Sequence, residues 1–258
     1  RITQGGGFKK DCIETFSETN TGDPQILYSF CKWAVDHYPA ERYALILWNH
    51  GSGWWEDAKS RAAGATGRKQ RRHLFRHYFP QEHRSICYDD TSEGDALDNR
   101  ELRVVLAGIC ALLGRKIDLV GMDACLMNMV EVAWQLRDSV KMIVGSEIEE
   151  PFDGWPCAEI LSCLTTRPRQ DAAAFARWIV KSYLISYQGK GEIVTQSALH
   201  VSRISDVVTK IDALSESLLA ALETDAQPIV SAWKKSPRFY DDNYVDLLCF
   251  AKHLRKKT

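Results

Sequence analysis

Cys125 and His50 are the two side chains of this sequence whose settings point most directly to chemistry. Cys125 closely follows an apolar run at residues 117–122, and His50 closely follows another at residues 43–48. Apolar runs of this length, bounded by turn residues, are typical of strands covered on both faces of a parallel sheet. Chemistry in such sheets collects beyond the carboxyl ends of the strands. A thiol and an imidazole placed there together predict a cysteine-dependent hydrolase.

The local setting of each residue has a plainer interpretation as well. The pattern predicts a helix over residues 126–136 with Cys125 at its N-terminal edge, where backbone N–H groups lower a thiol's pKa and hold an oxyanion. The alternative is a buried structural cysteine. His50 precedes the flexible run Gly51-Ser52-Gly53, and its alternative is a histidine in a polar loop. Function is favoured because both residues follow strand ends.

The elements that must position these residues alternate between strands and helices along the chain. Asp98 and Glu101 form a capping box before one helix, Gly114 follows its end, and another helix opens at Pro24. This alternation predicts an α/β fold with a mostly parallel central sheet, flanked by helices on both faces. The capped helix is predicted over residues 102–113, and further helices over 126–136, 171–187, 205–223, 228–235 and 245–255. Strands are predicted over 43–48, 85–88, 117–122, 141–146 and 192–201.

Composition excludes several classes of protein. The 33 basic and 34 acidic residues of the 258-residue chain nearly cancel, so the whole molecule makes no electrostatic case for nucleic acid or a membrane surface. No apolar run approaches the ~20 residues that span a bilayer. Eight cysteines in a chain of this length do not form a disulfide scaffold. The start, RITQGGGFKK, has no signal-peptide pattern, and we expect a fragment or processed form whose localisation cannot be read.

Several separated segments resemble the clostripain-like cysteine peptidases, which are relatives of the caspases and gingipains. The segments are LILWNHGSGW, a strand ending in Asp-Ala-Cys, EEPFDGWP, NTGDPQILYSFCKWAVDHYP, SALHVSRISDVVTKIDAL and YVDLLCFAKHL, and together they cover most of the chain in the family's order. The resemblance implies a caspase-like sandwich that lacks its N-terminal strand here. It makes His50 the catalytic histidine, Cys125 the nucleophile, and the amides of Gly51 and Cys125 the oxyanion donors.

The resemblance also implies specificity for Arg or Lys before the cut. It places an acidic pocket at Asp123, two residues before the cysteine, and at Asp153 in the FDGW segment. A guanidinium or ammonium group taken from water needs a buried opposite charge, which gives the physical reason. The alternatives are a helix cap for Asp123 and a turn residue before Gly154 for Asp153.

The interval 58–84 breaks every pattern, since it holds eight Lys or Arg and a single acidic residue. It predicts a long exposed loop or a disordered insertion. His73, His77, His83 and Cys87 show spacings that zinc sites use, but the basic charge and the lack of paired cysteines argue against zinc. A nucleic-acid contact has no surrounding module to support it. By the resemblance, relatives cut themselves in this interval, which fits an enzyme that cleaves after Arg or Lys.

The expected organisation is a single peptidase domain over residues 1–258, with the insertion at 58–84 and a helical C-terminal part at 202–258. We expect peptide or protein substrates with Arg or Lys before the cut, no nucleic acid and no membrane span. No cofactor is expected; the resemblance allows calcium activation and a secreted or cell-envelope location, and no calcium site is identifiable. The alternative is a catalytically inactive or regulatory caspase-like domain, and a third class is a different thiol hydrolase or transferase.

Overall fold

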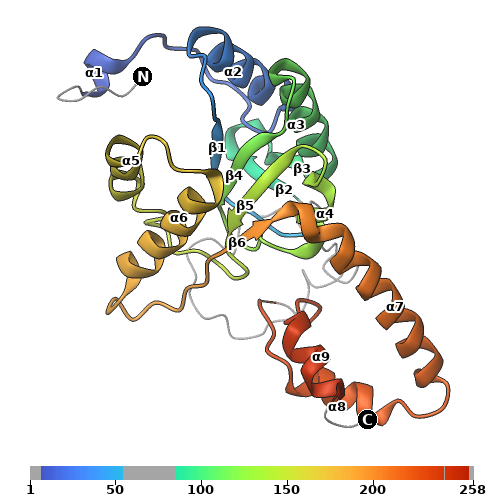
Figure 1. Cartoon of the computed structure of the whole chain (residues 1–258). Helices are drawn as coiled ribbons and strands as arrows, with labels where there is room; N and C mark the ends of the chain where they lie inside the picture. The colour runs from blue at the N-terminus through green and yellow to red at the C-terminus, as the bar shows by residue number, and fades with distance from the viewer. Residues whose placement is uncertain (1–6, 55–84, 241, 256–258) are drawn as a thin grey trace.

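A four-stranded sheet forms the centre of the molecule (Figure 1), in a computed structural model that describes residues 7–54, 85–240 and 242–255. Its strand order is β1-β4-β5-β6. The strands β1 (Ala44–Trp48), β4 (Ile117–Asp123) and β5 (Val140–Gly145) run parallel, and β6 (Ser197–His200) is antiparallel to β5. The predicted mostly parallel sheet is confirmed.

Helices cover both faces of this sheet, as the alternation of elements predicts (Figure 1). On one face lie α2 (Pro24–His37), α3 (Asn99–Leu113) and α4 (Val130–Leu136), and on the other lie α5 (Cys157–Thr166) and α6 (Ala172–Tyr187). Alternate residues of β4 and β5 point to opposite faces, as strand geometry requires. One core therefore contains Val120 and Ile143 with side chains of α3, and the other contains Leu119 and Val144 with side chains of α6.

Local capping explains where the two best-predicted helices begin and end. The Asp23 side chain accepts a hydrogen bond from the Gln25 N–H at 2.7 Å, just before Pro24 opens α2. Asp98 and Glu101 form the predicted capping box of α3. Gly114 ends α3 with a left-handed φ of 64°, a conformation that glycine adopts without a Cβ penalty. These signals depend only on neighbouring residues, which is why the sequence predicts them.

Two α-helices and one strand of the described residues are absent from the sequence-based prediction. The short helix α1 (Phe8–Asp11) lies near the N-terminus. The strand β2 (Ser85–Asp89) pairs with an unpredicted strand β3 (Asp95–Asp98) through the short η2 helix (Asp90–Ser92). The helix α5 was unpredicted too, because only Ile160 and Cys163 of its ten residues are buried and no side-chain cap marks its start.

The C-terminal part is helical within the described residues, with η3 (Val201–Arg203), α7 (Ile204–Leu222), α8 (Gln227–Lys235) and α9 (Leu247–Arg255). In Figure 1, α7 projects away from the sheet and α8 lies beside α9. The segment before α9 returns to the loop after β1, where the Tyr244 hydroxyl donates a hydrogen bond to the Ser52 carbonyl at 3.1 Å. The C-terminal part therefore helps to hold the histidine loop.

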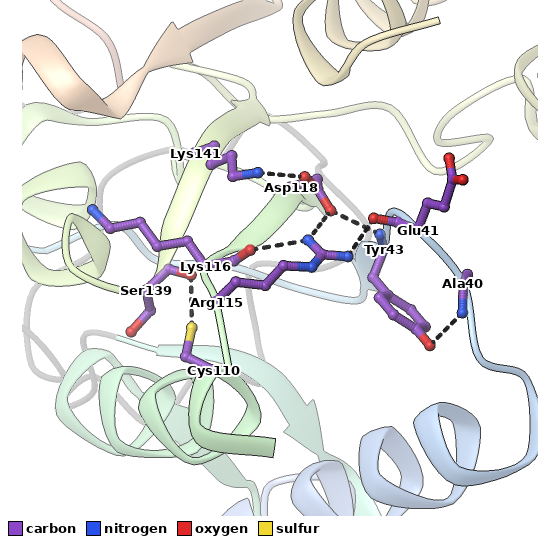
Figure 2. A network of polar contacts seen from close by, with 9 residues as sticks. All are labelled: Ala40, Glu41, Tyr43, Cys110, Arg115, Lys116, Asp118, Ser139 and Lys141. Atoms are coloured by element: carbon purple, nitrogen blue, oxygen red, sulfur yellow. Dashed lines mark hydrogen bonds and ion pairs between the residues drawn. The ribbon is translucent and has the colours of Figure 1, made fainter. Parts of the chain in front are cut away.

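A polar network ties together the amino ends of the three parallel strands (Figure 2). The buried Asp118 carboxylate of β4 accepts hydrogen bonds from Arg115 at 2.6 Å, from Lys141 at 2.8 Å, and from the Tyr43 backbone N–H at 3.0 Å. The Lys141 bond reaches the start of β5, and the Tyr43 bond reaches the residue before β1. A hollow of about 420 Å³ lies beside this network, at the end of the sheet opposite to Cys125.

Candidate active site

The register of the sheet brings the two predicted catalytic segments side by side. Trp48 at the end of β1 pairs with Asp123 at the end of β4, and the Asn49 N–H donates to the Asp123 carbonyl at 3.3 Å. Beyond the ends of these strands, a Cβ atom placed on Gly51 would lie 2.5 Å from the Cys125 carbonyl oxygen. The loop that carries His50 is therefore packed directly against the backbone of Cys125.

The hairpin strand β2 fixes the histidine loop from the other side. The Cys87 N–H donates to the His50 carbonyl at 3.3 Å, and the Ser52 N–H donates to the Ser85 carbonyl at 3.1 Å. These two bonds flank the isolated bridge between Gly51 and Ile86. Because backbone direction alternates along an extended segment, the Gly51 N–H points away from β2. That orientation suits the predicted oxyanion donor.

The predicted start of the helix at residue 126 is wrong, since α4 begins at Val130 and Cys125 lies in a turn. Leu126 has a left-handed φ of 66°, which a helix cannot include. The Leu126 and Asn128 N–H groups donate to the carbonyls of Ile148 and Ser146 at 3.1 and 3.0 Å. These long-range bonds hold residues 126–128 against the loop after β5 in a non-helical conformation. No helix N-terminus therefore lies at the thiol to lower its pKa.

The Cys125 thiol rests against the backbone of Glu150. The Glu150 N–H donates to Sγ at 3.2 Å, and the Glu150 carbonyl lies 4.0 Å from Sγ. The pKa of Cys125 is raised to about 11, mainly by burial and also by the nearby carboxyl groups of Glu150 and Glu149, against the lowering effect of the Glu150 N–H. In the resting structure Cys125 is a protonated thiol at neutral pH.

Asp123 is buried beside the cysteine, with 5% of its surface exposed. Its Oδ2 atom accepts a hydrogen bond from the Trp155 backbone N–H at 2.9 Å. Gly154 has a left-handed φ of 59°, and a Cβ atom there would lie 2.9 Å from Asp123 Oδ2. Because only glycine fits this close approach without strain, the chain at residues 154–155 closes directly over the carboxylate.

Glu150 is a site residue that the sequence reasoning missed. Its carboxyl group interacts with that of Asp123, and its Oε1 atom accepts from Trp155 Nε1 at 3.4 Å. Burial raises the pKa of Glu150, and the Asp123 carboxylate raises it further. The available signal was the EEPFDGWP segment, which places Glu150 only three residues before Asp153. Nothing in the segment itself shows which of these acids points inward.

Asp153 lies in a different environment from Asp123. Its side chain is 76% exposed, and its Oδ2 atom lies 3.7 Å from Lys190 Nζ. The structure thus places Asp153 outside the buried part of the site, and its role in substrate binding stays a prediction. The turn at Asp153 and Gly154 is held by Tyr187, whose hydroxyl donates to the Gly154 carbonyl at 2.9 Å.

Other sequence-based assignments concern metals, membranes and the basic insertion. No cluster of three His, Cys, Asp or Glu side chains suited to a metal occurs among the described residues. None of the helices within the described ranges is long and apolar enough to cross a bilayer. The interval 58–84 lies outside the described residues, so its zinc, nucleic-acid and self-processing interpretations all stay predictions.

Comparison with known proteins finds relatives in one family. The family model of the clostripain family matches residues 1–256. Clostripain from Hathewaya histolytica is 32% identical over 125 residues, which make up 46% of this chain and 19% of that protein. A secreted C11 cysteine protease from Bacteroides thetaiotaomicron, solved with an irreversible peptide inhibitor, aligns with a TM-score of 0.60 at 22% identity, covering 94% of this chain and 60% of that one.

A third relative is an inactive zymogen of a C11 protease from Parabacteroides distasonis. It aligns with a TM-score of 0.57 at 18% identity, covering 93% of this chain and 57% of that one. The chain spans less than two thirds of the length of each of these relatives. The structural likenesses confirm the caspase-like sandwich. Because the family model matches almost the whole sequence, this chain belongs to the clostripain family of C11 peptidases.

Proposed function

We propose that this chain forms the catalytic part of a cysteine endopeptidase that cleaves peptide bonds after Arg or Lys. The observation that carries the proposal is the close packing of Gly51 on the Cys125 backbone at the ends of two adjacent parallel strands, beside the buried Asp123. A nucleophile, a proton donor and a buried negative charge are thereby gathered at one edge of the sheet.

The residues have complementary roles in the proposed reaction. The Cys125 thiol loses its proton, by way of solvent, to the His50 imidazole, and its sulfur attacks the carbonyl carbon of the scissile bond. The backbone N–H groups of Gly51 and Cys125 stabilise the resulting oxyanion. His50 then donates a proton to the leaving amine, which departs as the acyl-enzyme forms. Water hydrolyses the acyl-enzyme and returns the thiol.

Specificity follows from the charge beside the nucleophile. A basic side chain that enters the site leaves water, so it needs an opposite charge in the protein. Asp123 is the buried carboxylate closest in sequence to Cys125, and Asp153 provides a second, exposed carboxylate on the neighbouring turn. Arg is expected to be preferred over Lys, because its planar fork bonds two carboxylate oxygens at once.

One observation favours the alternative of a non-catalytic or regulatory domain. Burial holds the pKa of Cys125 at about 11, so the resting thiol is less reactive than an ordinary one. The same observation fits an enzyme that is latent until it is processed. We therefore include self-processing within 58–84 in the proposal, because an enzyme specific for Arg or Lys would find eight such residues there.

The test is a panel of fluorogenic peptides that differ only in the residue before the cut. Wild type should cleave after Arg and Lys, whereas Cys125→Ala and His50→Ala should each lose roughly 10³-fold or more of kcat/KM. Cys110→Ala is the matched control, because this thiol is also half-buried but bonds the Ser139 carbonyl at 2.9 Å, away from His50 and Asp123.

Two results would contradict the proposal. Full activity in Cys125→Ala or His50→Ala would remove the assigned dyad. A chain that cleaves no peptide, and in which a thiol-directed peptide reagent shows no selectivity for Cys125 among the eight cysteines, would instead support the regulatory alternative.

A further inference from the structure

A group of buried polar atoms without hydrogen-bond partners surrounds the carboxyl group of Glu150. Among the described residues, Glu150 Oε2, the Tyr183 hydroxyl oxygen and both amide atoms of Gln196 are enclosed and have no well-aligned hydrogen-bond partner. Tyr183 is fully buried and Gln196 is 7% exposed. Each unpaired buried polar group costs about 1–3 kcal/mol, so a cluster of them indicates a site for a polar ligand.

These atoms come from three separate elements that meet at Glu150. Tyr183 lies on α6, Gln196 immediately precedes β6, and Glu150 belongs to the loop after β5. Gln196 lies near enough to lower the pKa of Glu150, although burial and Asp123 outweigh that effect. The unpaired amide is therefore directed at the carboxyl pair.

Asp123 and Glu150 cannot both be ionised in this setting without a third group between them. Two carboxylates in contact share one proton, because like charges in a buried site repel. Burial raises the pKa of both groups, and their mutual interaction raises the pKa of Glu150 and lowers that of Asp123. The proton therefore resides on Glu150, and the pair carries one negative charge.

Among the residues that the structure describes, the groups that face this pair supply no positive charge. They are the Trp155 indole from the same loop, the Cys125 thiol beyond β4, the Cys157 thiol of α5, Gln196, and the Tyr183 and Tyr187 hydroxyls of α6. The nearby cation Lys190 lies 3.7 Å from the exposed Asp153 and 4.8 Å from the centre of the Tyr187 ring. Within the described ranges, then, Asp153 has a cation beside it and the Asp123–Glu150 pair has none.

We propose that the basic side chain before the scissile bond takes the place of the proton shared by Asp123 and Glu150, which makes Glu150 the second inner carboxylate of the specificity pocket. The inference rests on the proposed function. The exchange releases the proton to solvent and leaves the buried cluster with the same single negative charge, since two carboxylates and one cation replace two carboxylates and one proton. Asp153 remains at the rim.

This arrangement links specificity to the nucleophile through one residue. The Glu150 backbone N–H donates to Cys125 Sγ at 3.2 Å, while its side chain meets Asp123. A cation that draws the Glu150 carboxylate toward itself therefore acts on the segment against which the thiol rests. The unpaired carbonyl oxygen of the Gln196 amide offers a further acceptor for a guanidinium N–H group.

The test compares peptides that carry Arg or citrulline before the cut, because citrulline keeps the shape of Arg without its charge. In Glu150→Gln, the ratio of kcat/KM for Arg over citrulline should fall roughly 100-fold, as expected for the loss of a buried charge pair. Glu149→Gln is the matched control, because it is the same substitution at the neighbouring but exposed carboxyl group, and it should change the ratio by less than about 3-fold. Gln has the shape of protonated Glu, so a purely structural Glu150 predicts an unchanged ratio.

A second measurement needs no change at Glu150. Calorimetric titration of Cys125→Ala with an Arg peptide, in buffers of different ionisation enthalpy, should show about one proton released per peptide bound near pH 7. An unchanged Arg-to-citrulline ratio in folded Glu150→Gln, or binding without proton release, would overturn the inference alone. A wild-type enzyme that prefers a neutral or acidic residue before the cut would overturn the proposed specificity, and the inference with it.

Discussion

Gly51 and Cys125 are packed so closely that neither can be moved without the other. A Cβ atom on Gly51 would lie 2.5 Å from the Cys125 carbonyl oxygen and 2.7 Å from Met127 Cγ. The first contact is to backbone, which cannot turn aside as a side chain can. The position of the His50 backbone relative to Cys125 is thus set by the absence of a side chain at the next residue.

Gly51→Ala is therefore expected to abolish peptide cleavage, with a loss of roughly 100-fold or more in kcat/KM, because a displacement of about 1 Å in a reacting group has an effect of that size. Gly7→Ala is the control, since a Cβ atom there meets nothing within 4 Å. Activity assays and thermal unfolding of both variants would check this. A Gly51→Ala enzyme with wild-type kcat/KM would show that the loop adjusts freely.

The pH dependence of Cys125 alkylation is a second prediction. Burial raises the pKa of this thiol to about 11, so its reaction with iodoacetamide should quicken by about tenfold per pH unit between pH 7 and 9, without a plateau. The raised pKa also favours the folded state. That contribution is complete below the ordinary thiol pKa and is lost as the pH rises through about 11.

Peptide mapping after timed alkylation would resolve Cys125 from the other cysteines. A plateau in its rate below pH 8 would mean that a thiolate already forms in the resting protein. In that case the contact between Sγ and the Glu150 backbone would not describe the resting nucleophile.

Asp118 provides a test of the fold. Burial raises its pKa, but hydrogen bonds from Lys141, Arg115 and the Tyr43 N–H outweigh that effect and lower it. Asp118→Ala removes the acceptor for all three donors, so it should lower the free energy of unfolding by about 2–4 kcal/mol. The stability lost by the variant relative to wild type should shrink as the pH falls from the ordinary carboxyl pKa through the lowered pKa of Asp118. Over that range the wild-type carboxylate is protonated and its contribution to stability disappears.

Asp206→Ala is the matched control for this variant. Asp206 also pairs with an Arg three residues earlier, at 3.0 Å, but both side chains are exposed. Its removal should change stability by less than about 1 kcal/mol. Chemical denaturation of both variants would measure the loss in free energy of unfolding. Equal losses would show that burial does not increase the contribution of the Asp118 network to stability.

The sequence predicts those features that short-range patterns determine. The capping box at Asp98 and the apolar runs before His50 and Cys125 each depend on neighbouring residues, and all appear in the structure. The placement of both catalytic residues at one sheet edge follows from parallel strands. The pairing of β1 with β4, which makes them neighbours, does not follow from local pattern.

The features that the sequence does not predict depend on long-range contacts. Residues 126–129 have an apolar pattern that suits a helix, yet hydrogen bonds to the loop after β5 hold Leu126 and Asn128 in a non-helical conformation. Glu150 and Asp153 are both acidic residues of one loop, and only the closure of Gly154 over Asp123 decides which of them lies inside. Sequence patterns carry no information on that closure.

Self-processing within 58–84 is the last prediction, and it follows from the proposed specificity. Four basic residues stand in the short run Arg68, Lys69, Arg71 and Arg72. Exposed segments rich in small and polar residues are where proteolytic cutting concentrates. Intact-mass measurement of wild type and Cys125→Ala, made in the same host, should show two fragments divided within this run for wild type and a single chain for the variant.

A variant with Gln at these four positions tests whether peptide cleavage requires self-cutting. If cutting is the activating step, this uncut chain should cleave Arg peptides at least about 10-fold more slowly than wild type. A second variant, in which a host protease site replaces the run, should still be cut. Identical intact chains for wild type and Cys125→Ala, with wild type fully active, would show that the interval is not a processing site. Fragments that appear equally in both would assign the cut to the host.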